Sequence, residues 1–380
     1  MNIVIAIDSL KGSLTSLEAG HAIAEGIRRV DPAVTLTVKP LADGGEGTVE
    51  ALTYGKTCIA EKNMVTGPLG SPVLCEYHRI PDTKSAIIEM AGAAGLPLVP
   101  EEKRNPLYTT TYGVGETIRD AIQKGCRNFI IGIGGSATND GGIGMLQALG
   151  YEFLTADGKN VPHGALGLSV LKAIKTDHVI PHLNECRFRI ASDVTNVLCG
   201  EQGCSAVYGP QKGATPSMVH DMDGWLSHYA ALANKINPKA DPSIPGSGAA
   251  GGLGFAFLAF THASLESGIQ IVLDESGLAK DMETADLIIT GEGRLDGQTA
   301  MGKAPIGVAG LAKQYQKPVI ALAGSVTKDA RICNQHGIDA FFPILRTIVP
   351  LEKAMEPELA KENLSDTAEQ VFRLWSLKRG

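Results

Sequence analysis

The chain has 380 residues, of which 44% are hydrophobic and 20% are charged, and its net charge is −7. This length exceeds that of one ordinary domain, so we expect two. The acidic balance, with charges of both signs interspersed, argues against nucleic acid or an anionic membrane as the main partner. A phosphorylated small molecule stays compatible, because the site for such a ligand is local.

The seven cysteines are scattered and form no C-x-x-C pair, which favours buried free thiols in a reducing compartment. The N-terminus begins directly in an apolar strand, with no basic region and no cleavage site before it. The longest apolar stretch, near 253–265, is too short to cross a bilayer. We therefore expect a soluble cytoplasmic protein.

The first segment has the pattern of a β-α-β unit. A strand over 2–7 ends at Asp8, a helix opened by the capping box Thr15–Glu18 stops at Pro32, and a strand over 34–40 follows. Both strands lead into polar, glycine-containing loops that carry a carboxylate. In an open parallel sheet such loops lie at the carboxyl ends of the strands, where ligands bind.

From about Lys56 the pattern changes, and after about Ala285 the α/β alternation returns. In the middle part we expect antiparallel strands over 73–79 and 86–90, strands over 128–131 and 187–191, and helices over 143–149 and 216–235. In the last part we expect strands over 286–290, 318–323 and 340–343, and helices over 306–315, 328–335 and from 351 onward. The fold class is therefore α/β. We expect a domain of residues 1–64 plus 286–380, an inserted domain of residues 65–285 with additional β-hairpins, and the active site in the cleft between them.

A glycine-rich turn over 132–142 joins one of the predicted strands to a helix. Such a turn lets backbone N–H groups approach a phosphate closely. Asp140 would repel a bare phosphate, and a bridging Mg²⁺ would remove that conflict. The alternative is that Asn139 or Asp140 only caps the helix, although a cap accounts for one polar residue of several. Glycine makes up 45 of the 380 residues, or about 12%, whereas its average share is about 7%.

Two motifs resemble nucleotide-binding signatures without meeting their requirements. Gly246–Gly251 satisfies G-x-G-x-x-G, but the residues before it do not form a strand, which argues against a dinucleotide site. Gly297–Lys303 has most of a P-loop, but Ala304 stands where Ser or Thr would coordinate Mg²⁺. Lys303 fits a phosphate contact or an ordinary surface lysine about equally well.

What remains is a set of carboxylates at the starts of loops, accompanied by basic residues. The carboxylates are Asp8, Asp43, Glu46, Asp140, Asp193, Glu292 and Asp296, and the basic residues are Lys11, Lys212, Arg294 and Lys303. Phosphoryl transfer needs this mixture, because acids hold Mg²⁺ and accept a proton while cations neutralise the moving phosphoryl group. Taken singly, each acid is better explained as a helix cap or a surface charge, and it is the joint pattern that favours phosphoryl transfer.

Six ordered motifs resemble those of the type-1 glycerate kinases of bacteria. They are Asp8–Ser13, Ala42–Thr48, Gly134–Gly142, Asp193–Asn196, Gly209–Gly213 and Thr290–Asp296, and they extend over essentially the whole chain. The resemblance implies an ATP- and Mg²⁺-dependent kinase that phosphorylates D-glycerate to 2-phosphoglycerate. Formation of 3-phosphoglycerate, an NAD-linked hydroxy-acid oxidoreductase and a non-catalytic nucleotide sensor are the alternatives. We expect a monomer or a homodimer.

The roles of individual residues are assigned from their chemistry. The predicted catalytic residues are Asp193 as the base, with Asp43, Lys11 and Arg294. The predicted nucleotide contacts are Gly134, Gly135, Ser136, Thr138, Asn139, Gly141, Gly142 and Lys212. The predicted glycerate contacts are Asp8, Ser9, Glu46, Asn196 and Asp296, and the predicted metal ligands are Asp140, Asp193 and Glu292.

Overall fold

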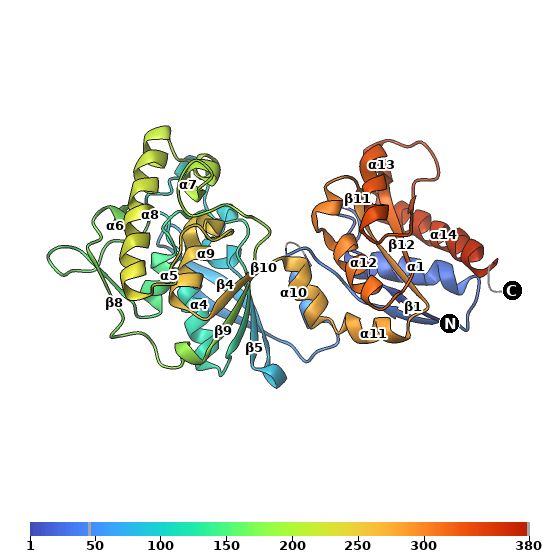
Figure 1. Cartoon of the computed structure of the whole chain (residues 1–380), viewed down its shortest axis with the longest axis horizontal. Coiled ribbons are helices and arrows are strands. Elements are labelled where there is room, and N and C mark those ends of the chain that lie inside the picture. The colour runs from blue at the N-terminus through green and yellow to red at the C-terminus, as the bar shows by residue number, and fades with distance from the viewer. Residues whose placement is uncertain (45–46, 378–380) are drawn as a thin grey trace. The chain divides into compact units, whose positions relative to one another are not determined.

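The computed structural model describes residues 1–44 and 47–377 (Figure 1). The chain divides into two compact units, which are described separately. Unit 1 consists of Met1–Gly55 and Gly268–Gly380, and unit 2 consists of Lys56–Ser267. In the part of the chain that is described, no helix has both the length and the apolar character needed to cross a membrane.

Unit 1 is built on a five-stranded sheet in which every neighbouring pair is parallel. Its strands are β1 (Asn2–Ile5), β2 (Thr35–Val38), β11 (Leu287–Leu295), β12 (Val319–Val326) and β13 (Ala340–Pro343), in the order β13-β12-β11-β1-β2. From β1 the chain moves to β2 on one side, whereas β11, β12 and β13 extend the sheet on the other. The strand order therefore reverses between β1 and β11, and open α/β sheets bind ligands at such a point.

Helices cover both faces of this sheet (Figure 1). The long helices α1 (Ser16–Arg28) and α14 (Pro357–Ser376) pack together over one face, on a core that includes Ile3, Ile5 and Ile289. The alternate residues of the strands are buried as well and face α11 and α12. Burial on both faces explains why these strands are almost continuously apolar. The remaining helices of unit 1 are α2 (Thr48–Thr53), α10 (Gly268–Glu275), α11 (Leu278–Thr284), α12 (Ala304–Gln314), α13 (Leu351–Ala354) and the 3₁₀ helices η6 (Thr299–Met301) and η7 (Lys328–His336).

Unit 2 has a mixed six-stranded sheet in the order β10-β9-β6-β5-β4-β3. The neighbours from β10 to β5 are parallel, and β5-β4-β3 is an antiparallel meander. Its strands are β3 (Ile59–Thr66), β4 (Pro72–Ile80), β5 (Ser85–Glu89), β6 (Asn128–Gly132), β9 (Arg187–Ala191) and β10 (Ala263–Glu266), with a separate ribbon of β7 (Glu152–Leu154) and β8 (Ala173–Lys175). Its helices are α3 (Ala91–Ala94), α4 (Tyr112–Gln123), α5 (Ile143–Ala148), α6 (Ala165–Ser169), α7 (Cys204–Tyr208), α8 (Pro216–Ile236) and α9 (Ala249–Phe260). Short 3₁₀ helices lie at η1 (Pro81–Thr83), η2 (Leu96–Leu98), η3 (Glu101–Lys103), η4 (Leu183–Glu185) and η5 (Pro210–Lys212).

The α/β fold class is confirmed, and the unit boundaries lie at 55/56 and 267/268 rather than at 64/65 and 285/286. The first boundary moves because β3 pairs along its whole length with β4 and so belongs to unit 2. The second moves because α10 and α11 pack against α12 in unit 1. The predicted active-site cleft between the domains stays a prediction.

Three elements of unit 1 differ from the sequence-based expectation. Strand β11 runs on to Leu295 instead of ending at Thr290, because its pairing with β12 continues through Arg294 and Leu295. The helix expected near 328–335 is the 3₁₀ helix η7. The C-terminal helix is divided, with α13 ending at Ala354 and α14 starting at Pro357, since proline fits the first turn of a helix and cannot continue one.

Candidate active site

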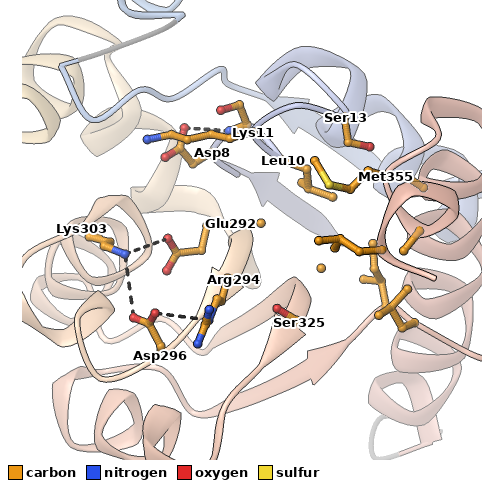
Figure 2. A pocket seen from close by; sticks show the side chains of 18 of the residues that line it. Asp8, Leu10, Lys11, Ser13, Glu292, Arg294, Asp296, Lys303, Ser325 and Met355 are labelled. Atoms are coloured by element: carbon orange, nitrogen blue, oxygen red, sulfur yellow. Dashed lines mark hydrogen bonds and ion pairs between the residues drawn. The ribbon is translucent and has the colours of Figure 1, made fainter. Parts of the chain in front are cut away.

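A cavity of about 430 Å³ lies at the carboxyl ends of the strands of unit 1. Loops that follow β1, β2 and β13 contribute to its lining, as do the last residues of β11 and β12. Figure 2 shows acidic and basic side chains on one side of the cavity and Leu10 and Met355 on another. The cavity therefore occupies the place that the reversal of strand order marks for a ligand.

Asp8 is the most deeply buried carboxylate in this cavity, with 5% of the residue exposed. The pKa of Asp8 is raised from its usual value of 3.8 to about 6, mainly by burial and to a smaller extent by the nearby charges of Asp43 and Glu292. The backbone N–H of Ser9 donates to Asp8 Oδ1 at 2.7 Å and, with Lys11, opposes this rise. A carboxyl with this pKa exchanges its proton readily near neutral pH.

The cations of the cavity are paired with its acids. Lys11 Nζ donates to Asp43 Oδ2 at 2.8 Å, and this hydrogen bond raises the pKa of Lys11. Arg294 is more loosely held, since its Nε lies 3.6 Å from Asp296 Oδ2 and two thirds of its side chain is exposed. Both cations thus remain next to carboxylates that lie near the strand ends.

Glu292 and Asp296 are held in place by one threonine. Thr299 Oγ1 donates to Glu292 Oε1 at 2.6 Å, and the N–H of Asp296 donates to Thr299 Oγ1 at 3.0 Å. Asp296 Oδ1 in turn accepts the N–H groups of Gln298 and Thr299 at 3.0 and 3.2 Å. Burial raises the pKa of Glu292. This network fixes two carboxylates in the loop that leads to α12.

Lys303 extends this acidic group. It is the residue that precedes α12, and its Nζ lies 3.9 Å from Glu292 Oε2 and 3.8 Å from Asp296 Oδ1. From the sequence, Lys303 could be either a phosphate contact or a surface lysine. In the structure it lies in the lining of the cavity.

Because β11 is longer than expected, Glu292 and Arg294 lie on a strand and not in a loop. Residues two apart on a strand point to the same side. Glu292 is opposite Ala323 of β12, and Arg294 is opposite Ser325. Of the residues predicted for the site, unit 1 thus brings together Asp8, Ser9, Lys11, Asp43, Glu292, Arg294 and Asp296. Glu46 lies outside the described residues.

In unit 2 the glycine-rich turn is mostly interior. Gly134 and Gly135 are exposed, whereas the residues from Ser136 to Gly142 are buried. Gly142 and the first turn of α5 are covered, since a Cβ on Gly142 would lie 2.5 Å from that of Ala256. Thr138, Asn139, Gly141 and Gly142 thus shape the turn from inside, and their role as nucleotide contacts stays a prediction. Gly134 and Gly135 stay predicted contacts.

Lys212 stabilises this turn from inside. Its Nζ donates to Ser136 Oγ at 2.8 Å and to the carbonyl oxygen of Thr138 at 2.6 Å, and only 2% of the residue is exposed. Burial lowers the pKa of Lys212 to about 8. The ammonium is thus bonded to the turn itself and away from solvent, and the role of Lys212 and Ser136 in nucleotide binding stays a prediction.

Asp140 also has internal partners. Oδ2 accepts the N–H and the hydroxyl of Thr111, both at 2.9 Å, and Oδ1 accepts the N–H of Gly142 at 3.1 Å. The residue is fully buried, which raises its pKa. Asp140 thus joins the turn to the start of α4, and its role as a metal ligand stays a prediction.

Asp193 and Asn196 follow β9, the strand beside β6 in the sheet of unit 2. Asp193 is exposed. Asn196 is engaged by the protein, since its Nδ2 donates to the carbonyl of Gln202 at 2.9 Å and its Oδ1 accepts the hydroxyl of Tyr208 at 2.7 Å. Asp193 belongs to unit 2 and Glu292 belongs to unit 1, so their joint role as metal ligands stays a prediction. Within residues 1–44 and 47–377, no three His, Cys, Asp or Glu side chains form a group that could hold a metal ion.

The Gly246 motif has a packing role in unit 2. Residues 237–248 contain no strand. A Cβ on Gly251 would lie 2.1 Å from the carbonyl oxygen of Thr138, so glycine lets the start of α9 approach the glycine-rich turn. Gly251 and Gly252 also have left-handed backbone conformations. The dinucleotide interpretation is therefore unsupported by the fold.

The model of the family described as "Glycerate kinase family" matches residues 3–376. The chain belongs to the glycerate kinase family.

Members of the glycerate kinase family match over both units. A glycerate kinase from Haemophilus influenzae is 48% identical over the full length of both chains. A glycerate 2-kinase from Escherichia coli K12 is 48% identical over 93% of each chain. A crystal structure described as glycerate kinase 2, from Salmonella typhimurium LT2, is 47% identical, with a TM-score of 0.90 over 100% of this chain and 99% of that one.

Several residues of the cavity escaped the sequence-based prediction. Thr299 orients the two carboxylates, and Ser325, Leu351 and Met355 complete the lining. The sequence offered a signal for Thr299, because this residue lies within the segment that resembles a P-loop. It offered no signal for the apolar residues, since α13 and the loop after β13 meet the Asp8 loop only in the folded sheet.

Proposed function

We propose that this member of the glycerate kinase family transfers the γ-phosphoryl group of MgATP to the 2-hydroxyl of D-glycerate and forms 2-phosphoglycerate. The observation that carries the proposal is the cavity of unit 1, which gathers Asp8 and Glu292 with Lys11, Arg294 and Lys303 at the point where the strand order reverses. The name of the Escherichia coli relative supports the 2-position. Formation of 3-phosphoglycerate is the alternative.

The reaction needs a base, and two carboxylates are candidates. A carboxylate accepts the hydroxyl proton while the oxygen bonds to the γ-phosphorus, and the bond to ADP breaks with its electron pair leaving on ADP. Asp193 is the base predicted from the sequence. Asp8 is a second candidate from the structure, because a pKa of about 6 suits proton transfer near neutral pH.

The residues present fit a magnesium ion that enters with the nucleotide. Mg²⁺ takes oxygen ligands, keeps several waters and uses one or two carboxylates together with phosphate oxygens. A preassembled group of three ligands is therefore not required. Asp8 and Glu292 offer such oxygens, and the charge of Glu292 raises the pKa of Asp8, so a cation between them relieves their repulsion. Asp193 stays a proposed ligand.

The cations have a matching role in the transfer. Lys11, Arg294 and Lys303 supply positive charge to the phosphoryl oxygens and to the glycerate carboxylate. Arg294 is suited to hold a carboxylate with two parallel hydrogen bonds, because its own ion pair with Asp296 is loose and exposed.

The test uses the full-length chain with D-glycerate and MgATP, and follows both ADP release and the product by ³¹P NMR. We expect ADP and 2-phosphoglycerate in equal amounts, and loss of turnover with EDTA that returns with Mg²⁺. A product phosphorylated at the 3-position favours the alternative. Turnover indifferent to EDTA excludes the magnesium dependence. If the incubation with MgATP yields no ADP while a parallel incubation with NAD yields NADH, the kinase is excluded. Light scattering gives the oligomeric state.

A further inference from the structure

The cavity of unit 1 has an apolar part that D-glycerate and phosphate do not need. It is lined by Leu10, Ile344, Leu345, Leu351, Ala354 and Met355. These residues come from the loop after β1, the loop after β13, helix α13 and the residue that follows this helix. A three-carbon acid that is polar at every carbon gains nothing from such a surface, whereas a flat heteroaromatic ring does.

Apolar side chains in this part are open to solvent. Leu351 is 73% exposed and Leu345 is 40% exposed, although both border the cavity. Met355 lies over the loop, since a Cβ on Gly12 would come within 2.8 Å of its Cε. A thioether and branched aliphatic side chains form a surface on which an aromatic ring packs well.

Two hydroxyl groups in the same cavity have no partner. The Oγ atoms of Ser9 and Ser13 are buried and make no hydrogen bond in the described part of the chain. Figure 2 shows Ser13 with Leu10 and Met355, away from the group of Glu292, Asp296 and Lys303. Buried hydroxyls are normally bonded, so a ligand with donors and acceptors at its edge would satisfy them.

We propose that this apolar part binds the adenine base of the nucleotide, with Leu351 and Met355 against the ring. The inference rests on the proposed function for the identity of the nucleotide. The polar side of the same cavity, with Lys11, Arg294 and Lys303, then faces the phosphates. A single cavity of about 430 Å³ thus offers an apolar surface and a charged one to the two ends of one ligand.

The test measures binding of MgADP and of inorganic tripolyphosphate to the full-length chain by calorimetry. Met355→Ala should raise the Kd for MgADP roughly tenfold or more, because it removes apolar surface that the base buries. Tripolyphosphate, which has no base, should bind as to the unchanged protein. Leu351→Ala should act in the same direction, and its exposed position keeps the fold intact. Met301→Ala is the matched control, since Met301 is 85% exposed and outside the lining.

Two results would overturn the inference: an unchanged Kd for MgADP in both variants, or an equal loss of affinity for tripolyphosphate. The measurement does not depend on turnover. If MgADP binding follows Met355 while the chain fails to phosphorylate glycerate, the base subsite stands and the proposed function falls. If turnover is normal and neither variant changes MgADP binding, the proposed function stands and the base subsite falls.

Discussion

Asp8 offers a test in which stability and activity change in opposite directions. Its carboxyl has a pKa of about 6 in the folded chain, against 3.8 usually. The folded state therefore holds the proton more tightly than the unfolded state, and folding stability is lost as the pH rises from about 4 through 6. A shift of this size corresponds to about 3 kcal/mol, since one pKa unit is about 1.4 kcal/mol.

The substitution Asp8→Asn removes this penalty at neutral and higher pH. The amide oxygen can still accept the N–H of Ser9, whereas the attraction to Lys11 is lost. We therefore expect the free energy of unfolding at pH 8 to rise by about 1–3 kcal/mol and to differ little from that of the unchanged chain at pH 4. Turnover should fall, because the carboxylate that faces Asp43, Lys11 and Glu292 is gone.

Urea unfolding followed by circular dichroism at pH 4 and pH 8 measures the difference. Asp31→Asn is the matched control, because Asp31 is partly exposed and its Oδ1 also accepts one backbone N–H, from Ala33 at 2.9 Å. The control should show no such gain at pH 8. Equal effects of Asp8→Asn at the two pH values, or a loss of stability at pH 8, would refute the reasoning from burial.

Three further substitutions test the remaining assignments. Arg294→Lys should lower kcat/KM roughly thirtyfold and leave thermal stability unchanged, because the pair with Asp296 is exposed and loose; unchanged kinetics would make the pair merely structural. Asp193→Asn should lower kcat by on the order of a hundredfold with nucleotide affinity unchanged. A near-normal kcat would instead favour Asp8, in the cavity of unit 1, as the base. Lys212→Met should cost about 1–3 kcal/mol of stability, since two buried oxygens in the turn lose their donor. Normal stability with lost ATP affinity would instead support the predicted nucleotide-binding role of Lys212.

Local signals in the sequence predicted the elements well where neighbours in the chain determine the structure. The capping box of Thr15 and Glu18 is present at the start of α1, and the strand Arg187–Ala191 has the predicted bounds. The extent of β11 was missed, because Gly291 and Gly293 suggest a turn and only the pairing with β12 keeps the strand extended. That pairing joins residues some thirty positions apart and leaves no local pattern.

The candidate site was predicted in part for the same reason. Carboxylates that end parallel strands meet at one edge of the sheet, so Asp8, Asp43 and Glu292 could be grouped from the sequence. Burial could not be predicted this way. Asp140 and Lys212 have the residue types of a phosphate and metal site, yet they are enclosed by α4, α8 and α9 and their neighbours, which approach only in the folded unit.

The position of β1 has a consequence for synthesis on the ribosome. It is an inner strand of the unit 1 sheet, and Ile3 pairs with Leu287 of β11. At roughly 5–20 residues per second, the N-terminal strand waits about 15–60 s for that partner to be translated. During this interval the whole of unit 2 is translated, while Ile3, Ile5 and Ile7 stay without their final cover. The nascent chain thus carries an uncovered apolar leading segment for most of its synthesis.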